Sequence, residues 1–404
     1  MTQPQSQTYT TSWVQSITEV PQDYWDVLAE PLRTPFLEWE WLRLLEASGS
    51  VSAQVGWLPL HLLVKQGQRL VAAAPLYLKG HSEGEFVFDH MWAHVAREMD
   101  IRYFPKMVGM SPFTPVGGYR FLVGPDEDRD VLQPLMLEAL DGLCRANGFS
   151  CVSLNFVDSG WRKAMESLGF HTWVHQGYLW ENRGYGSFEE YLRVFKTGQR
   201  RNIRRERAAL RRAGVKVRIV EGGDITRRDM ERLYDLYVST NEKFGEWSCK
   251  YLEPSFFPML LEEYGHRLLL VKAHRDDDPD AVLGMAFLVR KGEHLYGRYW
   301  GCFEHVEFLH FELCYYSPVE WALENGIRWY DPGMGGDHKM RRGFEYVPNY
   351  SLHRFFDPRL DHVFKQNIPM VNAFERERMA EGNSKVPFAK RRRTKARILG
   401  DKYK

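Results

Sequence analysis

The sequence has few cysteines and no long apolar segment. Its five cysteines form no C-x-x-C pair, so neither a disulfide framework nor a structural zinc site is expected. The N-terminal residues are polar and lack the apolar core of a signal peptide. No uncharged apolar run approaches the roughly 18 residues needed to span a bilayer. We therefore expect a cytoplasmic protein without a transmembrane segment, for which peripheral contact with a membrane surface stays open.

Net charge is also nearly absent. The chain carries 54 Lys and Arg against 53 Asp and Glu, which gives a formal charge of +1. Any attraction to nucleic acid or to a membrane must therefore come from a local patch. A length of 404 residues suggests two or three domains. Aromatic residues make up 14% of the chain, enough both to fill large cores and to line ligand sites.

The second half of the chain shows a clear order of elements. Thr226 with Asp229 three residues later resembles a helix capping box. Strand-like runs separated by turns predict an antiparallel meander. The predicted strands are Val215–Val220, Arg267–His274, Val282–Arg290, His294–Cys302 and Ile327–Tyr330, with a final strand pair over Phe344–Phe356; the helices begin at Thr226 and cover Pro254–Tyr264 and Phe308–Glu324.

The first half repeats this order more faintly. Asn147-Gly148 and Asn325-Gly326 each stand between a helix and a strand, and Gly169-Phe170 has a counterpart in Gly343-Phe344. The shared order indicates an internal duplication. Its predicted elements are strands at Trp13–Val20, Leu58–Lys65, Arg69–Lys79 and Cys151–Phe156, helices at Pro21–Glu30, Glu38–Ala47 and Arg129–Arg145, and an extra loop over His90–Val123.

This order of elements resembles the GNAT acyltransferase fold. We predict an α/β (α+β) protein with two tandem GNAT-like domains, whose mixed, mostly antiparallel sheets are flanked by helices. The expected organisation is a degenerate N-terminal half (residues 1–183), a basic linker helix (184–214), a C-terminal half with the active site (215–360) and a basic, flexible tail (361–404).

Three motifs resemble the FemAB-like relatives of the peptidoglycan bridge-forming peptidyltransferases. The basic segment Lys196–Arg207 (KTGQRRNIRRER) resembles the one that precedes their second acyltransferase half. The glycine-rich run Asp331–Phe344 (DPGMGGDHKMRRGF) and the segment Leu309–Tyr316 (LHFELCYY) resemble two further motifs of this broad family of predicted N-acyltransferases. The resemblance extends roughly from Phe36 to Phe356 and implies the transfer of an acyl or aminoacyl group to an amine.

The basic helix is the candidate anion-binding element. Eight basic residues and one acid lie between Lys196 and Arg212, and arginine forks suit phosphate and carboxylate groups. The expected ligand is a diphosphate, a carrier phosphopantetheine or a tRNA backbone. The alternative is a solvated helix face that pairs with acids elsewhere. The candidate binding residues here are Arg200, Arg201, Asn202, Arg204 and Arg205.

The candidate catalytic groups lie further along the chain. His338 is the expected base, since His is the usual proton acceptor near neutral pH, and Glu312 among aromatic residues is a second candidate base. A purely structural role is the alternative for each. The full set of candidates is Glu312, His338 and Asp337 as catalytic residues, and Tyr299, Trp300, His310, Lys339, Arg341 and Arg342 as substrate-binding residues. The resemblance further implies that backbone amides of Tyr296–Gly301 polarise the acyl carbonyl.

The donor stays open at this stage. Acetyltransferases hold the coenzyme A pyrophosphate in a glycine-rich loop before the central helix, but the matching segment Cys302–Phe308 has no glycine and contains Glu304 and Glu307. We expect no tightly bound cofactor, and an acyl-CoA, an acyl-carrier protein or an aminoacyl-tRNA as donor. The acceptor is a small-molecule or peptide amine. The alternatives are an aminoacyl-tRNA-dependent peptidyltransferase acting on a cell-wall precursor and a catalytically silent module that binds a ligand or peptide.

Overall fold

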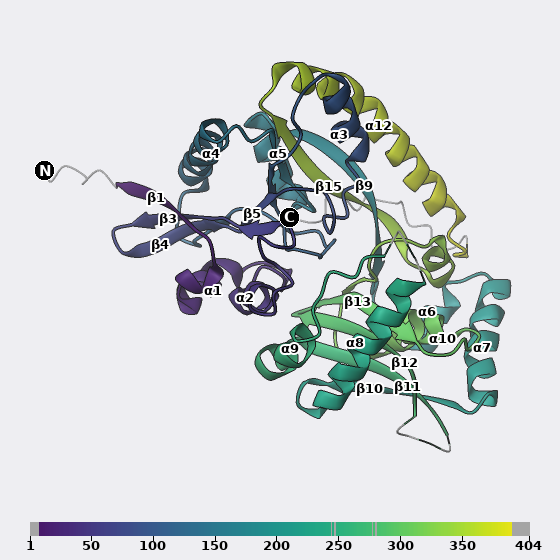
Figure 1. Ribbon diagram of the computed structural model, residues 1–404. Coiled ribbons are helices and arrows are strands. Elements are labelled where there is room, and N and C mark those ends of the chain that lie inside the picture. Colours follow the sequence, from purple (N-terminus) through teal and green to yellow (C-terminus); the bar gives the residue numbers. More distant parts are fainter. Residues whose placement is uncertain (1–7, 244, 246–247, 277, 279–280, 390–404) are drawn as a thin grey trace, which may run out of the picture. The chain divides into compact units, whose positions relative to one another are not determined.

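The computed structural model describes residues 8–243, 245, 248–276, 278 and 281–389, which divide into two compact units (Figure 1). Within these residues, unit 1 consists of 8–175 and 349–373, and unit 2 consists of 176–348 and 374–389. The sequence predicted one boundary near residue 183. Instead, β9 (His171–Glu181) and β15 (Glu345–Phe355) each run from one unit into the other, so each unit is built from two chain segments.

Unit 2 is organised around one sheet. Its strands lie in the order β10-β11-β12-β13-β14-β9, and only the β13–β14 pair is parallel. The predicted antiparallel meander is confirmed, with Gly292 supplying the positive φ of 52° at the turn between β12 and β13. The strands are β10 (Val215–Glu221), β11 (Leu268–Arg275), β12 (Val282–Lys291), β13 (His294–Cys302) and β14 (Trp329–Asp331).

Helices cover both faces of this sheet. Helix α8 (Arg227–Glu242), which opens with the predicted capping box of Thr226 and Asp229, lies with α9 (Phe256–Tyr264) over one face (Figure 1). The other face is covered by α10 (Leu309–Phe311), the π-helical turn η5 (Glu312–Tyr316) and α11 (Ser317–Glu324). The remaining helices are α6 (Phe188–Arg193), the predicted basic helix α7 (Thr197–Arg212) and the 3₁₀ helices η2 (Gly222–Asp224), η4 (Gly265–Arg267) and η6 (Asp337–Arg342).

Unit 1 contains two sheets. One has the order β1-β3-β4-β7, and the other runs through β15-β8-β6-β5-β2, with β6 and β8 parallel. The strands are β1 (Tyr9–Val14), β2 (Trp57–Pro59), β3 (His61–Gln66), β4 (Arg69–Ala74), β5 (Leu76–Lys79), β6 (Lys106–Gly109), β7 (Leu122–Val123) and β8 (Cys151–Leu154). The helices are η1 (Ile17–Glu19), α1 (Gln22–Ala29), α2 (Trp39–Ala47), α3 (His90–Glu98), α4 (Arg129–Ala146) and α5 (Ser159–Ser167).

The two units repeat one motif, as the sequence echoes predicted. In each, a helical segment connects two parallel strands: α4 joins β6 to β8, and α10 to α11 join β13 to β14. Both connections end at Asn-Gly, where Gly148 and Gly326 adopt φ values of 64° and 69°. Such left-handed residues end helices and are available to glycine at little steric cost. The predicted α/β fold with two related halves is therefore confirmed.

Three predicted features differ in the structure. The expected loop His90–Val123 contains α3 and β6, and the expected strand pair over Phe344–Phe356 is the single strand β15. The expected flexible tail from residue 361 begins as helix α12 (Pro358–Lys385), while residues 390–404 lie outside the described part of the chain. Leu360, Phe364 and Ile368 explain the helix, because this i, i+4, i+8 face is buried against α3 in the core of unit 1.

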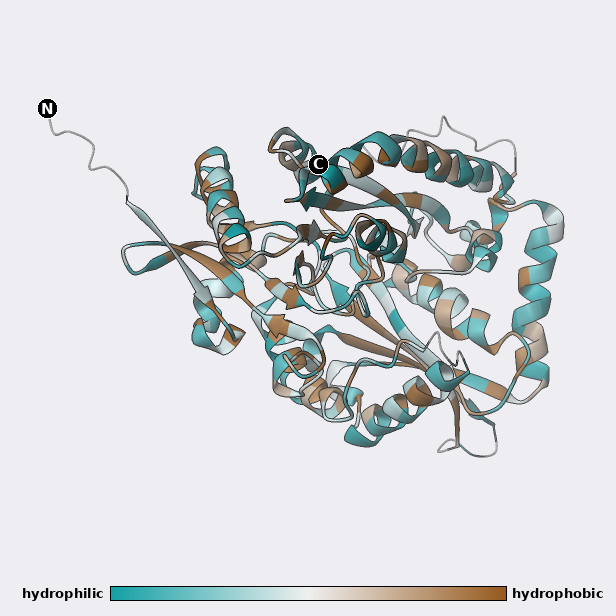
Figure 2. Cartoon of the chain, turned by 45° about the horizontal axis from the view of Figure 1, so that its top comes forward, coloured by the Kyte–Doolittle hydropathy of each residue, from teal (hydrophilic) through white to brown (hydrophobic). Residues whose placement is uncertain are grey.

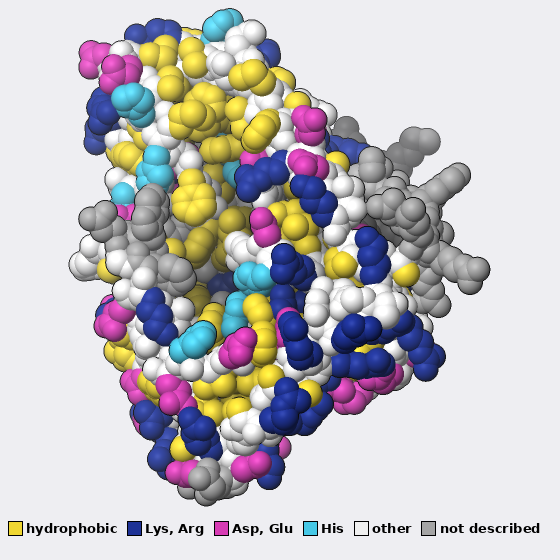
Figure 3. Space-filling view, turned by 90° about the vertical axis from the view of Figure 1, so that its right-hand side faces the viewer, with side chains coloured by type: hydrophobic (Ala, Val, Ile, Leu, Met, Phe, Trp, Pro, Cys, Tyr) yellow, Lys and Arg dark blue, Asp and Glu magenta, His cyan; other side chains and the backbone are white. Residues whose placement is uncertain are grey.

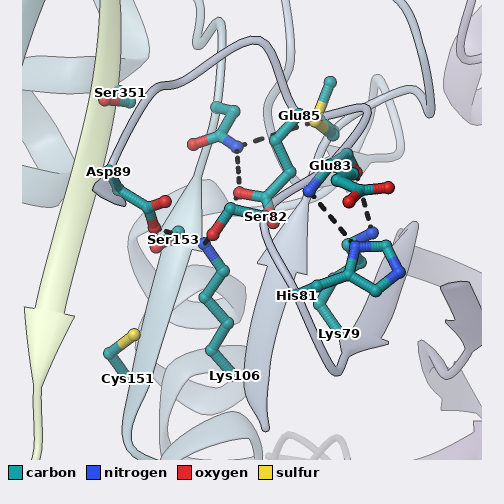
Figure 4. A network of polar contacts seen from close by, with 12 residues as sticks. Lys79, His81, Ser82, Glu83, Glu85, Asp89, Lys106, Cys151, Ser153 and Ser351 are labelled. Carbon is teal, nitrogen blue, oxygen red and sulfur yellow. Dashed lines mark hydrogen bonds and ion pairs between the residues drawn. The ribbon is translucent and has the colours of Figure 1, made fainter. Parts of the chain in front are cut away.

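The core of unit 1 also contains charge. Hydrophobic residues concentrate along the strands, as Figure 2 shows. Lys106 on β6 is nevertheless fully buried, and its amine donates hydrogen bonds to Ser82, Glu85 and Asp89 (Figure 4). Buried charges must be paired in this way, since an uncompensated one is costly.

No helix among the described residues is both long and apolar enough to cross a membrane.

Candidate functional site

Strands β13 and β14 of unit 2 pair over only a short distance. Their parallel register ends at Tyr296 opposite Asp331, whereas β13 stays paired with β12 as far as Cys302. The β12–β13 register shifts at Arg298, which therefore forms a β-bulge, and bulges re-aim the side chains next to them. Among the described strands, none pairs with Gly297–Cys302 on the β14 side. On the β14 side, the backbone N–H and C=O groups of this end of β13 therefore make no ladder hydrogen bonds to a described strand.

An unusual helix follows this end of β13. Phe308, with φ 67°, precedes α10, and the helix then widens into the π-helical turn Glu312–Tyr316. Such turns are rare and are frequently found at functional sites. The ring of His310 stacks on Trp300 of β13, with centroids 4.3 Å apart. Trp300 and His310, both predicted as substrate-binding residues, are therefore in direct contact.

Two histidines converge on one tyrosine in this region. The hydroxyl of Tyr315 lies 2.8 Å from Nε2 of His338 and 3.4 Å from Nε2 of His310. The centroids of the two imidazole rings are 5.2 Å apart. A tyrosine hydroxyl can donate one hydrogen bond and accept another, so Tyr315 can bridge both rings. We call His310, Tyr315 and His338 the histidine cluster.

Both imidazoles are held in their neutral form. Burial lowers the pKa of His310 to about 3. Burial and the nearby charges of Lys339 and Arg342 lower the pKa of His338 to about 4. Burial also raises the pKa of Tyr315. At neutral pH both rings are therefore unprotonated.

The glycine-rich loop sets the position of His338. Gly336 has φ 87°, and a Cβ atom built there would lie 2.3 Å from Cε1 of His338. Only glycine combines this backbone conformation with such a close approach. Asp337 points elsewhere: its carboxylate accepts hydrogen bonds from Tyr346 at 2.7 Å and Tyr178 at 3.2 Å. The hydrogen bond from Tyr346 is the main reason why the pKa of Asp337 lies below its usual range.

Lys339 and Arg342 brace this loop from inside. The buried amine of Lys339 donates to the carbonyl oxygens of Gly333 and Met334 at 2.7 and 3.0 Å, and burial lowers its pKa to about 8. Arg342 donates to the carbonyl oxygen of His338 at 2.9 Å and to Glu206 at 2.9 Å. Both were predicted to bind substrate, and the structure shows both engaged within unit 2.

Glu312 is likewise engaged. It is buried, it lies 3.1 Å from Nε of Arg207, and it accepts a hydrogen bond from Ser317 at 2.8 Å. Arg207 also pairs with Glu320 at 2.6 Å. These ion pairs anchor α7 to the helix that carries His310 and Tyr315.

The arginines of α7 divide into two groups. Arg207 faces the protein, whereas Arg201 and Arg205 are exposed and make no ion pair with any described residue. Arg204 pairs with the exposed Glu189 at 2.6 Å, and Arg200 donates to Thr197 at 3.3 Å. Figure 3 views the molecule from the side that carries α7. Lys and Arg side chains gather in the lower half of this view.

Three predicted substrate-binding residues remain to be placed, namely Asn202, Arg341 and Tyr299. Asn202 is half-buried on α7, and the side chain of Arg341 is exposed while its carbonyl oxygen accepts a hydrogen bond from Gln199. Tyr299 lies on the opposite face of the sheet from Trp300: its ring packs on Tyr237 of α8, with centroids 5.0 Å apart. The structure thus brings together Trp300, His310 and His338, but turns Tyr299 away from them.

Sequence reasoning missed Tyr315 as a site residue. In an α-helix, residues three and four apart share a face and residues five apart do not, so His310 and Tyr315 were not expected to meet. The i→i+5 bonding of a π-helical turn brings them together. No sequence signal announced this turn. Arg207 and Glu206 were missed for another reason, because their partners lie more than 100 positions away along the chain.

Comparison with known proteins identifies the family. The profile of the FemAB-like family, described as peptidoglycan biosynthesis and recognition, matches residues 16–390. The chain belongs to this family. It is therefore a transferase, as predicted from its motifs. No curated protein matches the sequence.

Solved structures are similar to this FemAB-like chain. FemX is 13% identical with a TM-score of 0.53, over 87% of this chain and 99% of that chain. The C-terminal domain of a candidate lysylphosphatidylglycerol synthetase from Agrobacterium fabrum is 10% identical with a TM-score of 0.50, over 89% and 96% of the two chains. A tandem GNAT protein from clavulanic acid biosynthesis is 11% identical with a TM-score of 0.46, over 87% and 99%.

Proposed function

We propose that this FemAB-like protein transfers an acyl or aminoacyl group to an amine, with His338 as the base. The observation that carries the proposal is the histidine cluster beside the open end of β13. A neutral imidazole next to a reacting amine can take up its proton. The hydroxyl of Tyr315 lies in hydrogen-bond reach of both His338 and His310, so it would orient the ring of His338 and link it to His310.

The reaction balances without a further reactant. The amine nitrogen attacks the acyl carbonyl, a new C–N bond forms, and the bond from the carbonyl carbon to the donor breaks. The proton lost by the amine goes to His338 and then to the departing donor group. Backbone N–H groups of Gly297–Cys302 that lie outside the ladder would hold the negative charge that develops on the carbonyl oxygen.

The chemistry of α7 and the family together favour an anionic donor and a peptide acceptor. Arg201 and Arg205 are exposed and keep their guanidinium groups available for phosphate. The loop Phe303–Phe308 offers less to coenzyme A, because Glu304 lies there and forms an ion pair with Arg275. The family's description as peptidoglycan biosynthesis and recognition supports a peptide amine of a cell-wall precursor as the acceptor. An aminoacyl-tRNA, whose phosphates the exposed arginines of α7 would contact, is the donor that we propose.

A comparison of two labelled donors tests this function. The purified protein is incubated with a peptidoglycan-precursor peptide and, in parallel, with radiolabelled aminoacyl-tRNA or acyl-CoA. We expect labelled peptide from the aminoacyl-tRNA, and none after ribonuclease treatment. Transfer from acyl-CoA alone would support the acyltransferase activity but contradict aminoacyl-tRNA as the donor. No transfer from any donor, with the peptide still bound, would favour a silent binding module.

The low pKa of His338 predicts an unusual pH profile. A group with a depressed pKa stays unprotonated as the pH falls, until the pH reaches that depressed value. The base form of His338 is therefore fully present at pH 7 and is lost only near pH 4. We expect kcat/KM, expressed per unprotonated acceptor, to stay level down to about pH 5, rather than to fall near the ordinary histidine pKa of about 6.5.

Two acceptors with different amine pKa values separate the enzyme's titration from that of the substrate. An acid limb near pH 6.5 that is shared by both acceptors would contradict a neutral, buried His338.

A further inference from the structure

Unit 2 contains a concave site on the face of its sheet that lies opposite the histidine cluster. A cavity of about 290 Å³ is lined by β10, β11, β12 and the start of α8. Its volume is close to the lower end of the range for small-molecule sites, about 300 Å³. Buried Val220 and Met285 form an apolar part of its wall. None of its lining residues belongs to the histidine cluster.

Side-chain directions separate this cavity from the proposed transfer site. Successive residues of a strand point to opposite faces of the sheet. Trp300 of β13 stacks on His310, whereas Tyr299 packs on Tyr237 of α8 and on Phe287 of β12. Met285 lies two residues before Phe287 on the same strand, so it shares that face. The cavity therefore lies on the α8 face, and the histidine cluster lies on the other.

The cavity has an excess of positive charge. Four basic residues line it, Arg218, Arg228, Arg232 and Lys272, against the two acidic residues Asp224 and Asp229. The pair of Lys272 and Asp229 is already satisfied, because the two form an ion pair and Asp229 also accepts hydrogen bonds from Thr226 in the helix cap.

Two of the arginines that line the cavity make no ion pair with a described residue. Arg232 lies 3.7 Å from Asp235, but Arg218 and Arg228 form no ion pair with any described residue. They come from different elements, β10 and α8, yet both line the same cavity. Both side chains are exposed, and two guanidinium forks at the wall of one concave site can together match the oxygens of a phosphate group.

We propose that this cavity binds the phosphoryl group of a small phosphorylated molecule, separately from the acyl donor and acceptor. Arg218 and Arg228 would hold the phosphate oxygens, and Val220 and Met285 would contact the less polar part of the ligand. The capping box fills the start of α8 with its own side chains, so the binding energy comes from the guanidinium groups.

Calorimetric titration of the full chain with pyrophosphate and with glycerol phosphate tests the site. Hydrogen bonds between charged groups contribute about 1.5–3 kcal/mol each, so Arg218→Gln and Arg228→Gln should each weaken binding about 10-fold or more. Arg227→Gln is the matched control. Arg227 is the neighbour of Arg228 on α8, but its side chain pairs with Glu231 and Glu262 and does not line the cavity. It should bind within about twofold of the wild type.

Other variants separate this site from the proposed transfer function. His338→Gln should bind both probes normally. Combined Arg201→Gln and Arg205→Gln on α7 should also bind normally, and a loss of binding there, with Arg228→Gln unaffected, would overturn the proposal. Absence of saturable binding, or equal weakening by Arg227→Gln, would overturn it too. Binding only to phosphatidylglycerol vesicles, with no affinity for the soluble probes, would replace the small molecule with a membrane surface.

Discussion

Replacing Lys106 with methionine is expected to lower the free energy of unfolding by about 3–5 kcal/mol. The amine of Lys106 is fully buried and lies 2.9 Å from Glu85, 3.0 Å from Ser82 and in direct contact with Asp89. Methionine has a similar length but no charge. It would leave two carboxylates buried without a cation, and the removal of one partner of a buried ion pair is far more costly than the pair is favourable.

The wider network shows why no neighbour can take over this role. Glu85 also accepts a hydrogen bond from Asn155 at 3.3 Å, and Asp89 accepts one from Tyr103 at 2.8 Å. These donors are neutral. Burial already raises the pKa of Glu85 to about 7 even with Lys106 in place. Without the amine, this carboxyl group would have to be protonated in the folded protein.

Lys79 provides a matched control. It is equally buried and lies in the same region (Figure 4), but its amine donates to the backbone carbonyl of Glu83 and lies 3.7 Å from the ring centre of Trp57. Burial lowers its pKa to about 7. Lys79→Met removes one hydrogen bond but leaves Glu85 and Asp89 paired with Lys106, so a loss of about 1 kcal/mol is expected.

Urea denaturation followed by circular dichroism measures both variants. Equal losses for Lys106→Met and Lys79→Met would contradict the ion-pair argument. A triple variant that adds Glu85→Gln and Asp89→Asn to Lys106→Met should recover part of the lost stability, because it removes the stranded charges. This comparison stays informative even if Lys106→Met alone is recovered in poor yield.

Local sequence signals predicted much of the fold. The capping box at Thr226, the meander of β11 to β13 and the basic helix α7 all depend on residues close together along the chain. Helix α12 carried a usable signal as well, since Leu360, Phe364 and Ile368 repeat every four residues, but residues 361–404 were predicted to form a basic, flexible tail. The face is evident once its partners, such as Trp92 of α3, are known.

The site depended on features that no local pattern contains. The sequence placed Glu312 and His338 in one catalytic role without distinguishing them. The structure separates the two environments: Arg207 of α7 holds Glu312 in an ion pair, whereas His338 faces Tyr315 and His310. The catalytic assignment of each stays a prediction. Their surroundings make His338 the stronger candidate base and Glu312 the stronger candidate for positioning the helix.

His338→Gln is therefore the variant with the largest expected effect on catalysis. Glutamine keeps a polar side chain of similar reach but cannot act as a base near neutral pH. Loss of a general base typically lowers the rate by about 10²- to 10⁴-fold. We expect kcat to fall by that factor with KM little changed, because the interaction that is lost belongs to the transition state. Rates of aminoacyl or acyl transfer, measured with the donor that the labelling experiment identifies, provide the test.

Two further variants make this result specific. His305→Gln changes an exposed histidine of the loop before α10 and should leave the rate unchanged. Tyr315→Phe removes the hydroxyl that lies 2.8 Å from His338 but keeps the ring that packs on Phe344, so it should lower kcat less than His338→Gln does. His338→Gln could instead retain the wild-type kcat while Tyr315→Phe loses activity. The proton acceptor would then be another group, and the role of His338 would be limited to packing against Gly336 in the glycine-rich loop.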